Sequence, residues 1–194
     1  SMGGVGRNIA HNLALLGADV RMLTAMGDDL YGQKITTACT ELGIDMSHAQ
    51  KLPGQSTSTY LYIAAPDGDM VMAISDMSVC DRIDPEYLAA NLTTLQNARV
   101  VVADSNIPVE SLVFLAENCK NPLFIDPVST VKAVKLRPIL SKIHTLKPNR
   151  LEAELLSGVK IETREDVAKA VLYLEENDYV TGIDLPINGG FSIS

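Results

Sequence analysis

Polar side chains that can bind a ligand follow three apolar segments of the sequence, at the point where each segment ends. Asp104-Ser105-Asn106 follows residues 100–103, Asp126-Pro127 follows residues 123–125, and Lys147-Pro148-Asn149 follows residues 143–146. Asp, Asn and Pro are also the usual residues of turns, so each group alone could be loop chemistry. Ligands of open α/β sheets bind outside the carboxyl ends of the strands, and three such groups in succession therefore favour a binding site.

A second candidate is the glycine-rich start of the chain, Gly3-Gly4-Val5-Gly6-Arg7-Asn8. Glycines are costly to order, so a cluster of them suggests a sharp bend or a close approach to a ligand. The N-terminus of a helix just beyond would offer N–H groups to hydroxyl or anionic oxygens. A plain turn before a helix fits the same pattern, and both interpretations stay open. The six-residue dinucleotide fingerprint is not present, which disfavours a Rossmann fold.

The segment Asn149-Arg150-Leu151-Glu152 also has two interpretations. Asn149 and Glu152 have the spacing of a capping box, which requires no function. Glu152 could equally orient a hydrated Mg²⁺ while Asn149 and Lys147 approach phosphate oxygens, because Mg²⁺ prefers hard oxygen ligands. The spacing favours the cap, and both roles can coexist.

The composition narrows the possible partners. The net charge of −8, from 16 Lys and Arg against 24 Asp and Glu, disfavours electrostatic capture of nucleic acid or of an acidic membrane. The three cysteines are far apart and lack metal-ligand spacing, which indicates neither a disulfide framework nor a zinc site and fits a reducing cytosol. We therefore expect a cytoplasmic protein with a small-molecule ligand.

These candidates need a mostly parallel sheet to position them. Apolar stripes at helical spacing predict helices around residues 9–16, 35–42, 85–95, 112–119 and 167–174, and strands are predicted at 20–25, 100–103, 123–125 and 143–146. Asp28 and Asp29 are predicted to be acidic residues at the start of a helix, where their charge is favourable to the helix dipole. Residues 57–63 and 70–74 flank Pro66-Asp67-Gly68 and predict a β-hairpin, with Tyr60 and Tyr62 on one face.

Together these motifs resemble the pfkB, or ribokinase-like, family of carbohydrate and nucleoside kinases. Residues 3–10, 24–32 and 147–152 are similar to its first glycine signature, to the strand and turn that follow, and to its Asn-x-x-Glu element. The resemblance implies a ribokinase-like α/β fold with helices on both faces of the sheet. It covers a partial domain at residues 1–176, with residues 54–76 as a β-hairpin lid, before a divergent tail at 177–194.

The resemblance also implies a function. It assigns substrate contacts to Gly3, Gly4, Asn8, Asp104 and Asn106. It assigns ATP contacts to Lys147, Asn149, Glu152 and Asp126, with Glu152 also toward Mg²⁺. The implied reaction moves the ATP γ-phosphoryl group to the ribose 5′-hydroxyl of a nucleoside or sugar, and the lid implies a homodimer.

Two family features do not occur in this sequence. They are a strand upstream of the glycine pair and a Gly-Ala-Gly-Asp block, whose Asp is the family's catalytic base. We therefore expect a chain incomplete at both ends relative to the family, and assign no catalytic residue. The alternative hypothesis is a truncated, non-catalytic homologue that binds a nucleoside or a partner protein.

Overall fold

The computed structural model describes residues 2–65, 70–163, 165–166 and 169. The chain divides into two compact units, one made of residues 1–91 and 106–108 and the other of residues 92–105 and 109–194. The predicted hairpin turn at 66–68, most of the predicted last helix at 167–174 and the tail at 177–194 lie outside the described residues. No helix within the described ranges is long and apolar enough to cross a membrane.

The first unit begins with alternating helices and strands. Helix α1 (Val5–Leu15) precedes strand β1 (Ala25–Gly27), helix α2 (Leu30–Glu41) and strand β2 (Gln50–Leu52), and β1 pairs with β2 in parallel. Ala10, Cys39 and Ile44 form one buried hydrophobic cluster of this unit, with Ala14 and Ile35 packed against it, so one face of each helix serves packing. The parallel pairing agrees with the fold class predicted from the sequence.

The strand predicted at 20–25 begins later than its apolar pattern suggests. An isolated bridge joins Arg21 to Asp45, and the continuous ladder forms only from Ala25 onward. The reason lies in the partner segment, where the Ala49 N–H donates to the Met46 carbonyl and turns the backbone away from the pairing direction.

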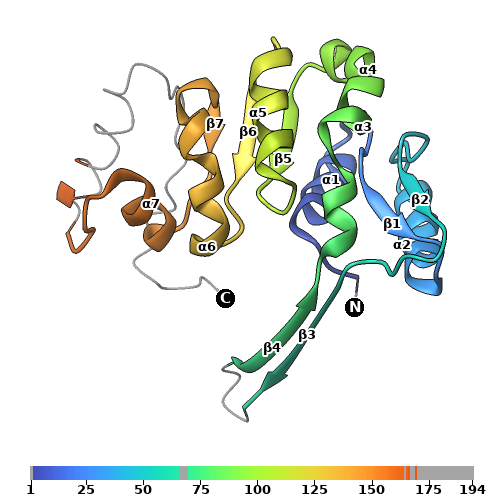
Figure 1. Ribbon diagram of the computed structural model, residues 1–194, viewed down its shortest axis with the longest axis horizontal. Coiled ribbons are helices and arrows are strands. Elements are labelled where there is room, and N and C mark those ends of the chain that lie inside the picture. Colours follow the sequence, from blue (N-terminus) through green and yellow to red (C-terminus); the bar gives the residue numbers. More distant parts are fainter. Residues whose placement is uncertain (1, 66–69, 164, 167–168, 170–194) are drawn as a thin grey trace. The chain divides into compact units, whose positions relative to one another are not determined.

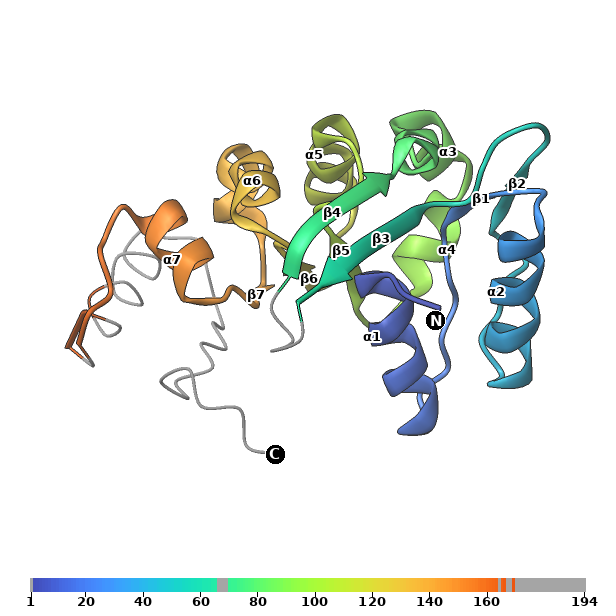
Figure 2. The ribbon, with the colours of Figure 1, turned by 90° about the horizontal axis from the view of Figure 1, so that it is seen from below.

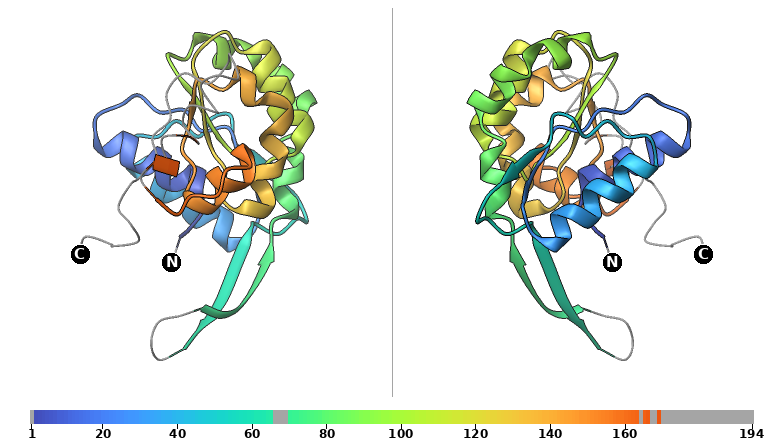
Figure 3. Two further views of the ribbon diagram at one scale, coloured as in Figure 1. Left: turned by 90° about the vertical axis from the view of Figure 1, so that its left-hand side faces the viewer. Right: turned by 90° about the vertical axis from the view of Figure 1, so that its right-hand side faces the viewer.

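The predicted β-hairpin is present as strands β3 (Thr59–Ala64) and β4 (Met70–Asp76), which pair antiparallel. We call these two strands the hairpin arm. In Figures 1 and 3 the arm extends away from the other elements of its unit. The rings of Tyr60 and Tyr62 lie with their centroids 6.3 Å apart, so both do occupy one face.

The helix predicted at 85–95 is two helices, α3 (Pro85–Ala90) and α4 (Leu92–Asn97). The break falls at Asn91, whose side-chain amide donates to the Tyr87 carbonyl and whose Oδ1 lies 2.8 Å from His48 Nδ1. Asparagine side chains compete with the helical backbone for hydrogen bonds, which the apolar periodicity does not reveal. A 3₁₀ helix, η1 (Ser78–Arg82), joins β4 to this region.

The second unit holds a parallel sheet in the order β5 (Val101–Asp104), β6 (Leu123–Asp126) and β7 (Thr145–Leu146). Helix α5 (Val109–Asn118), α6 (Thr130–Ala133) and the 3₁₀ helix η2 (Val134–Lys142) cover one face of this sheet, as Figures 1 and 2 show. Strand β7 is shorter than the predicted segment 143–146, because only Thr145 and Leu146 pair with β6. Helix α7 (Arg150–Ser157) follows β7 directly.

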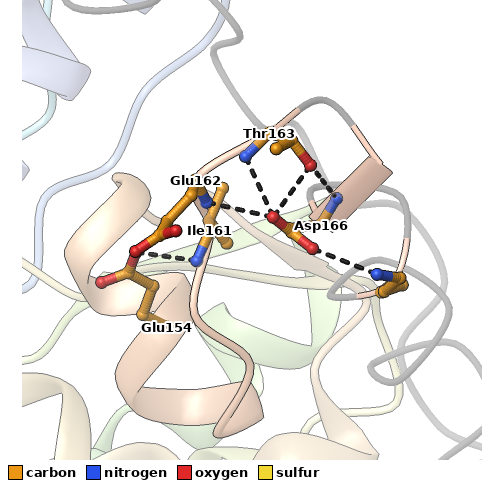
Figure 4. Close-up of polar contacts among 6 residues, drawn as sticks. Glu154, Ile161, Glu162, Thr163 and Asp166 are labelled. Atoms are coloured by element: carbon orange, nitrogen blue, oxygen red, sulfur yellow. Dashed lines mark hydrogen bonds and ion pairs between the residues drawn. The ribbon is translucent and has the colours of Figure 1, made fainter.

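A polar cap follows α7. The Asp166 carboxylate accepts hydrogen bonds from the Thr163 N–H and hydroxyl and from the Glu162 N–H (Figure 4). The ammonium of Lys169 lies 3.2 Å from the other oxygen of this carboxylate. These donors, the Thr163 hydroxyl foremost, lower the pKa of Asp166 to about 2. Because the Asp166 N–H bonds back to Thr163 Oγ1, this carboxylate has a structural role at a helix start.

Candidate functional site

The three polar groups after the strands of the second unit meet at the carboxyl edge of its sheet. Asp104 and Asp126 are register partners at the ends of β5 and β6, and Lys147 follows β7. The Lys147 ammonium lies 3.3 Å from Asp126 Oδ2. Sequence reasoning therefore predicted the juxtaposition of these side chains correctly, because parallel strands bring their carboxyl ends together.

The turn after β6 is strained. Val128 has a φ of 66°, and the Ser129 N–H donates across it to the Pro127 carbonyl at 2.7 Å. A positive φ is unfavourable for a β-branched residue, and this form of three-residue turn is rare. Asp126 Oδ1 accepts the Val128 N–H at 2.8 Å and holds the turn at the sheet edge.

Asn149 and Glu152 form the predicted capping box at the start of α7. Asn149 Oδ1 accepts the Glu152 N–H at 2.9 Å, and Glu152 Oε2 accepts the Asn149 N–H at 2.8 Å. The cap interpretation is thus confirmed. The metal interpretation stays a prediction, since the described residues contain no cluster of three or more His, Cys, Asp or Glu side chains that could hold an ion.

Glu152 is unusual for a capping residue because only 3% of its surface is exposed. Carboxylates are almost never this buried unless they are paired. Mg²⁺ commonly binds through one or two carboxylates plus waters and substrate phosphates. A buried carboxylate at the start of α7 therefore fits such an ion without a full protein cage.

The glycine turn begins α1 as predicted. Gly4 is the N-cap residue with a φ of 97°, a conformation that favours glycine, and its carbonyl accepts the Asn8 N–H at 2.9 Å. Gly3 has no such steric need, since a Cβ at this position would meet no atom within 4 Å. The bend explains Gly4, whereas the described structure gives no packing reason for Gly3.

Arg7 is the residue of this turn that sequence reasoning missed. Its guanidinium donates to the carbonyls of Met2 and Gly3 at 3.0 and 2.9 Å and also to Asn8 Oδ1. An open hollow is lined by Met2, Arg7, Asn8, His11 and Asn12. Arg7 and Asn8 both belong to the glycine-rich motif at residues 3–8. The spacing of the motif does not show whether its arginine donates to backbone carbonyls or is solvated.

The predicted site residues divide between the two units. Gly3, Gly4, Asn8 and Asn106 belong to the first unit, and Asp104, Asp126, Lys147, Asn149 and Glu152 belong to the second.

Ser105, between Asp104 and Asn106, is fully buried, and its hydroxyl has no hydrogen-bond partner within the described structure.

Asp29 makes more hydrogen bonds than its predicted place at a helix start requires. This side chain caps α2 through the Gly32 N–H, as expected of an acid at a helix start, but it also binds Thr57. The Gly32 N–H, then the Thr57 hydroxyl and the Thr57 N–H lower its pKa. The available signal was the pair of glycines at positions 27 and 32, each of which lies against backbone.

Comparison with known proteins identifies the family. The model of the pfkB family carbohydrate kinases matches residues 1–178. The chain belongs to this family. Its ribokinase-like α/β fold, with parallel strands and covering helices, is the fold class that the sequence predicted.

The similar relatives of this pfkB chain are kinases. Over 176 residues the chain is 48% identical to the pseudouridine kinase of Escherichia coli, covering 90% of this chain and 56% of that protein. It is 45% identical to an uncharacterized sugar kinase of the same organism, covering 91% of this chain and 49% of the relative. The chain thus spans about half the length of the curated relatives it matches.

Solved structures support the fold. A carbohydrate kinase from Agrobacterium tumefaciens is 28% identical with a TM-score of 0.77, over 93% of this chain and 59% of that one. A ribokinase from Arabidopsis thaliana complexed with ribose and ATP has a TM-score of 0.81 at 23% identity, over 94% of this chain and 60% of that one, and shows likeness of fold alone.

Proposed function

We propose that this chain carries the nucleoside-binding and phosphate-binding parts of an ATP-dependent kinase that phosphorylates the ribose 5′-hydroxyl of a nucleoside, with pseudouridine as the first candidate. The observation that carries the proposal is the 48% identity to a pseudouridine kinase over 90% of this chain. Residues 3–8, 102–106 and 124–129 also resemble segments of that enzyme. A cytoplasmic location accords with such a substrate.

In this proposal the glycine turn binds the sugar. Gly3 and Gly4 are exposed beside Asn8, and Gly3 lacks a packing reason to be glycine. The absence of a side chain at both positions would let hydroxyl groups approach the start of α1, where N–H groups favour oxygen ligands. Asp104 and Asn106 are assigned to the same substrate as polar groups after β5.

The carboxyl edge of the β5–β6–β7 sheet is assigned to the nucleotide. Lys147 supplies a positive charge for phosphate oxygens, and Asn149 offers its amide. Glu152 would hold Mg²⁺ through water, and Asp126, at the end of β6, would contact the nucleotide. When bound, the ion would neutralise charge on the phosphate oxygens. The chain's own side chains then position and orient the nucleotide, which is the main form of catalysis in phosphoryl transfer.

The hairpin arm is assigned to a lid that also meets a second copy of the chain. Register partners share a face of the arm, so Leu61, Ile63, Met72 and Ile74 lie on one side. All four are 53–66% exposed. A cluster of aliphatic side chains on one exposed face is typical of a protein–protein interface.

The sugar assignment is tested by thermal denaturation of the 194-residue chain with and without pseudouridine. A ligand at 100 times its Kd stabilises a folded protein by about 2.7 kcal/mol, so we expect Tm to rise by several degrees. Asn8→Ala should abolish this shift because it removes the side chain beside the glycine turn. Asn97→Ala, at an exposed asparagine of α4, should keep the shift.

The outcomes separate the two functional hypotheses. No shift at saturating pseudouridine in the unmutated chain would contradict the sugar assignment. A shift without phosphorylation when ATP and Mg²⁺ are added would favour the binding-only homologue.

A further inference from the structure

The hairpin arm has no hydrophobic core of its own to fix its position. The described side chains of Tyr60–Ile63 and Val71–Asp76 are all exposed. An isolated two-stranded hairpin is marginally stable at best in water. The position of the arm therefore depends on how its two ends are attached to the rest of its unit, and we call the end before β3, residues 55–59, the root.

That root is attached through Asp29 and Thr57. Asp29 Oδ2 accepts the Thr57 N–H at 2.8 Å, and Asp29 Oδ1 accepts the Thr57 hydroxyl at 2.7 Å. The Thr57 hydroxyl oxygen in turn accepts the Gly27 N–H at 3.1 Å. Hydrogen bonds to a charged group are about twice as strong as those between neutral groups. Thr57 is 4% exposed, so water competes weakly for these bonds.

The two flanking glycines make this attachment possible. A Cβ at Gly27 would lie 2.1 Å from the Gln55 carbonyl oxygen, and a Cβ at Gly32 would lie 2.3 Å from the Gly27 carbonyl oxygen. Both positions therefore exclude any side chain. The close packing brings strand β1, the start of α2 and the root of the arm together around one carboxylate.

We propose that Asp29 and Thr57 are positioning residues that latch the root of the hairpin arm onto β1 and α2, and so set where the arm stands over the substrate. The role as a lid rests on the proposed function, whereas the latch itself rests on the contacts above. Asp29 is thus more than a helix cap, because one carboxylate serves both α2 and the arm.

The test measures amide hydrogen exchange in the 194-residue chain. Thr57→Val removes the hydroxyl but leaves the bond from the Gly32 N–H to Asp29 intact. Asp29→Asn keeps a good helix cap but loses one carboxylate oxygen that accepts from Thr57. For both variants we expect amides of β3 and β4 to exchange about tenfold faster, while the exchange of α2 amides changes much less.

Two control variants and one reference sharpen the result. Thr57→Ser keeps the hydroxyl and should restore slow exchange in the arm. Asp28→Asn keeps the oxygen that accepts the Gly54 N–H and should change little. Amides of α5, in the other unit, report any global destabilisation, and faster exchange there in proportion to the arm would overturn the latch.

Unchanged exchange in the arm of Thr57→Val would also overturn it. Pseudouridine added to the unmutated chain then tests the lid separately. Protection of the arm by the nucleoside, lost in Thr57→Val and regained in Thr57→Ser, supports a positioning role. A ligand-insensitive arm with an intact latch would instead contradict the lid part of the proposed function.

Discussion

Asp29 shows how much one carboxylate can do when its hydrogen-bond donors come from two segments of the chain. The N–H and O–H donors of Gly32 and Thr57 stabilise its charged form and lower its pKa below the ordinary value of 3.8. A lowered pKa in the folded state means that Asp29 stabilises the fold above its unfolded pKa. That contribution is lost as the pH falls through the folded pKa.

The lowered pKa of Asp29 predicts how the stability difference between the unmutated chain and Asp29→Asn depends on pH. At neutral pH the unmutated chain should have a higher Tm than the variant. The difference should shrink as the pH falls below about 4, because Asp29 becomes protonated and loses its advantage over Asn. Thermal denaturation of both chains between pH 7 and pH 2 measures it, and a constant difference across that range would contradict the assignment.

The contacts of some residues could be predicted from the sequence, and those of others could not. Asn149 and Glu152 were predictable because a capping box is local, and three residues of spacing suffice to recognise it. The partnership of Asp29 with Thr57 was not predictable because it joins residues 28 positions apart. The positive φ of Val128 was equally hidden, since valine gives no signal for such a turn.

At the scale of elements, local patterns predicted most helices and strands, and tertiary contacts decided their ends. The hairpin and the parallel strands followed from alternation and apolar runs. The helix predicted at 85–95 divides because the Asn91 side chain binds Tyr87 and His48, and His48 is distant in sequence. The 3₁₀ helix η2 has Pro138 inside it and no clear periodic signal.

The two faces of the hairpin arm make different predictions. If the aliphatic face of Leu61, Ile63, Met72 and Ile74 meets a second copy, Leu61→Asp should convert a dimer to a monomer by burying an unpaired charge. Tyr62→Asp, on the opposite face, is the matched control and should leave the dimer intact. Analytical ultracentrifugation distinguishes the outcomes, and a monomeric unmutated chain would contradict this use of the arm.

At the scale of the whole molecule, the predicted site residues fall into two sets, one in each unit. The strand order predicted the set at the carboxyl edge of the β5–β6–β7 sheet, because topology alone brings Asp104, Asp126 and Lys147 together. The sequence pattern could not assign the glycine turn to a site, since a turn and a binding loop use the same residues. That assignment rests on the resemblance to the kinase family and stays a prediction.

The division into units predicts separable binding defects. Lys147→Ala should remove the Tm shift caused by ATP with Mg²⁺ and keep the shift caused by pseudouridine, while Asn8→Ala should do the reverse. Lys142→Ala is the matched control, because Lys142 is another exposed lysine of the second unit, paired with Glu117. Loss of both shifts in either variant, measured by thermal denaturation, would argue against two separate subsites.

The hairpin arm also bears on the solubility of the chain. Neither Thr59–Ala64 nor the stretch from Met70 to Ser75 contains a charged residue, and both are rich in β-branched, aromatic or aliphatic side chains. Segments of this composition with open strand edges are templates for intermolecular β pairing and aggregation. Covering the arm, by substrate closure or by a second copy, would therefore protect the protein from self-aggregation as well as serve its chemistry.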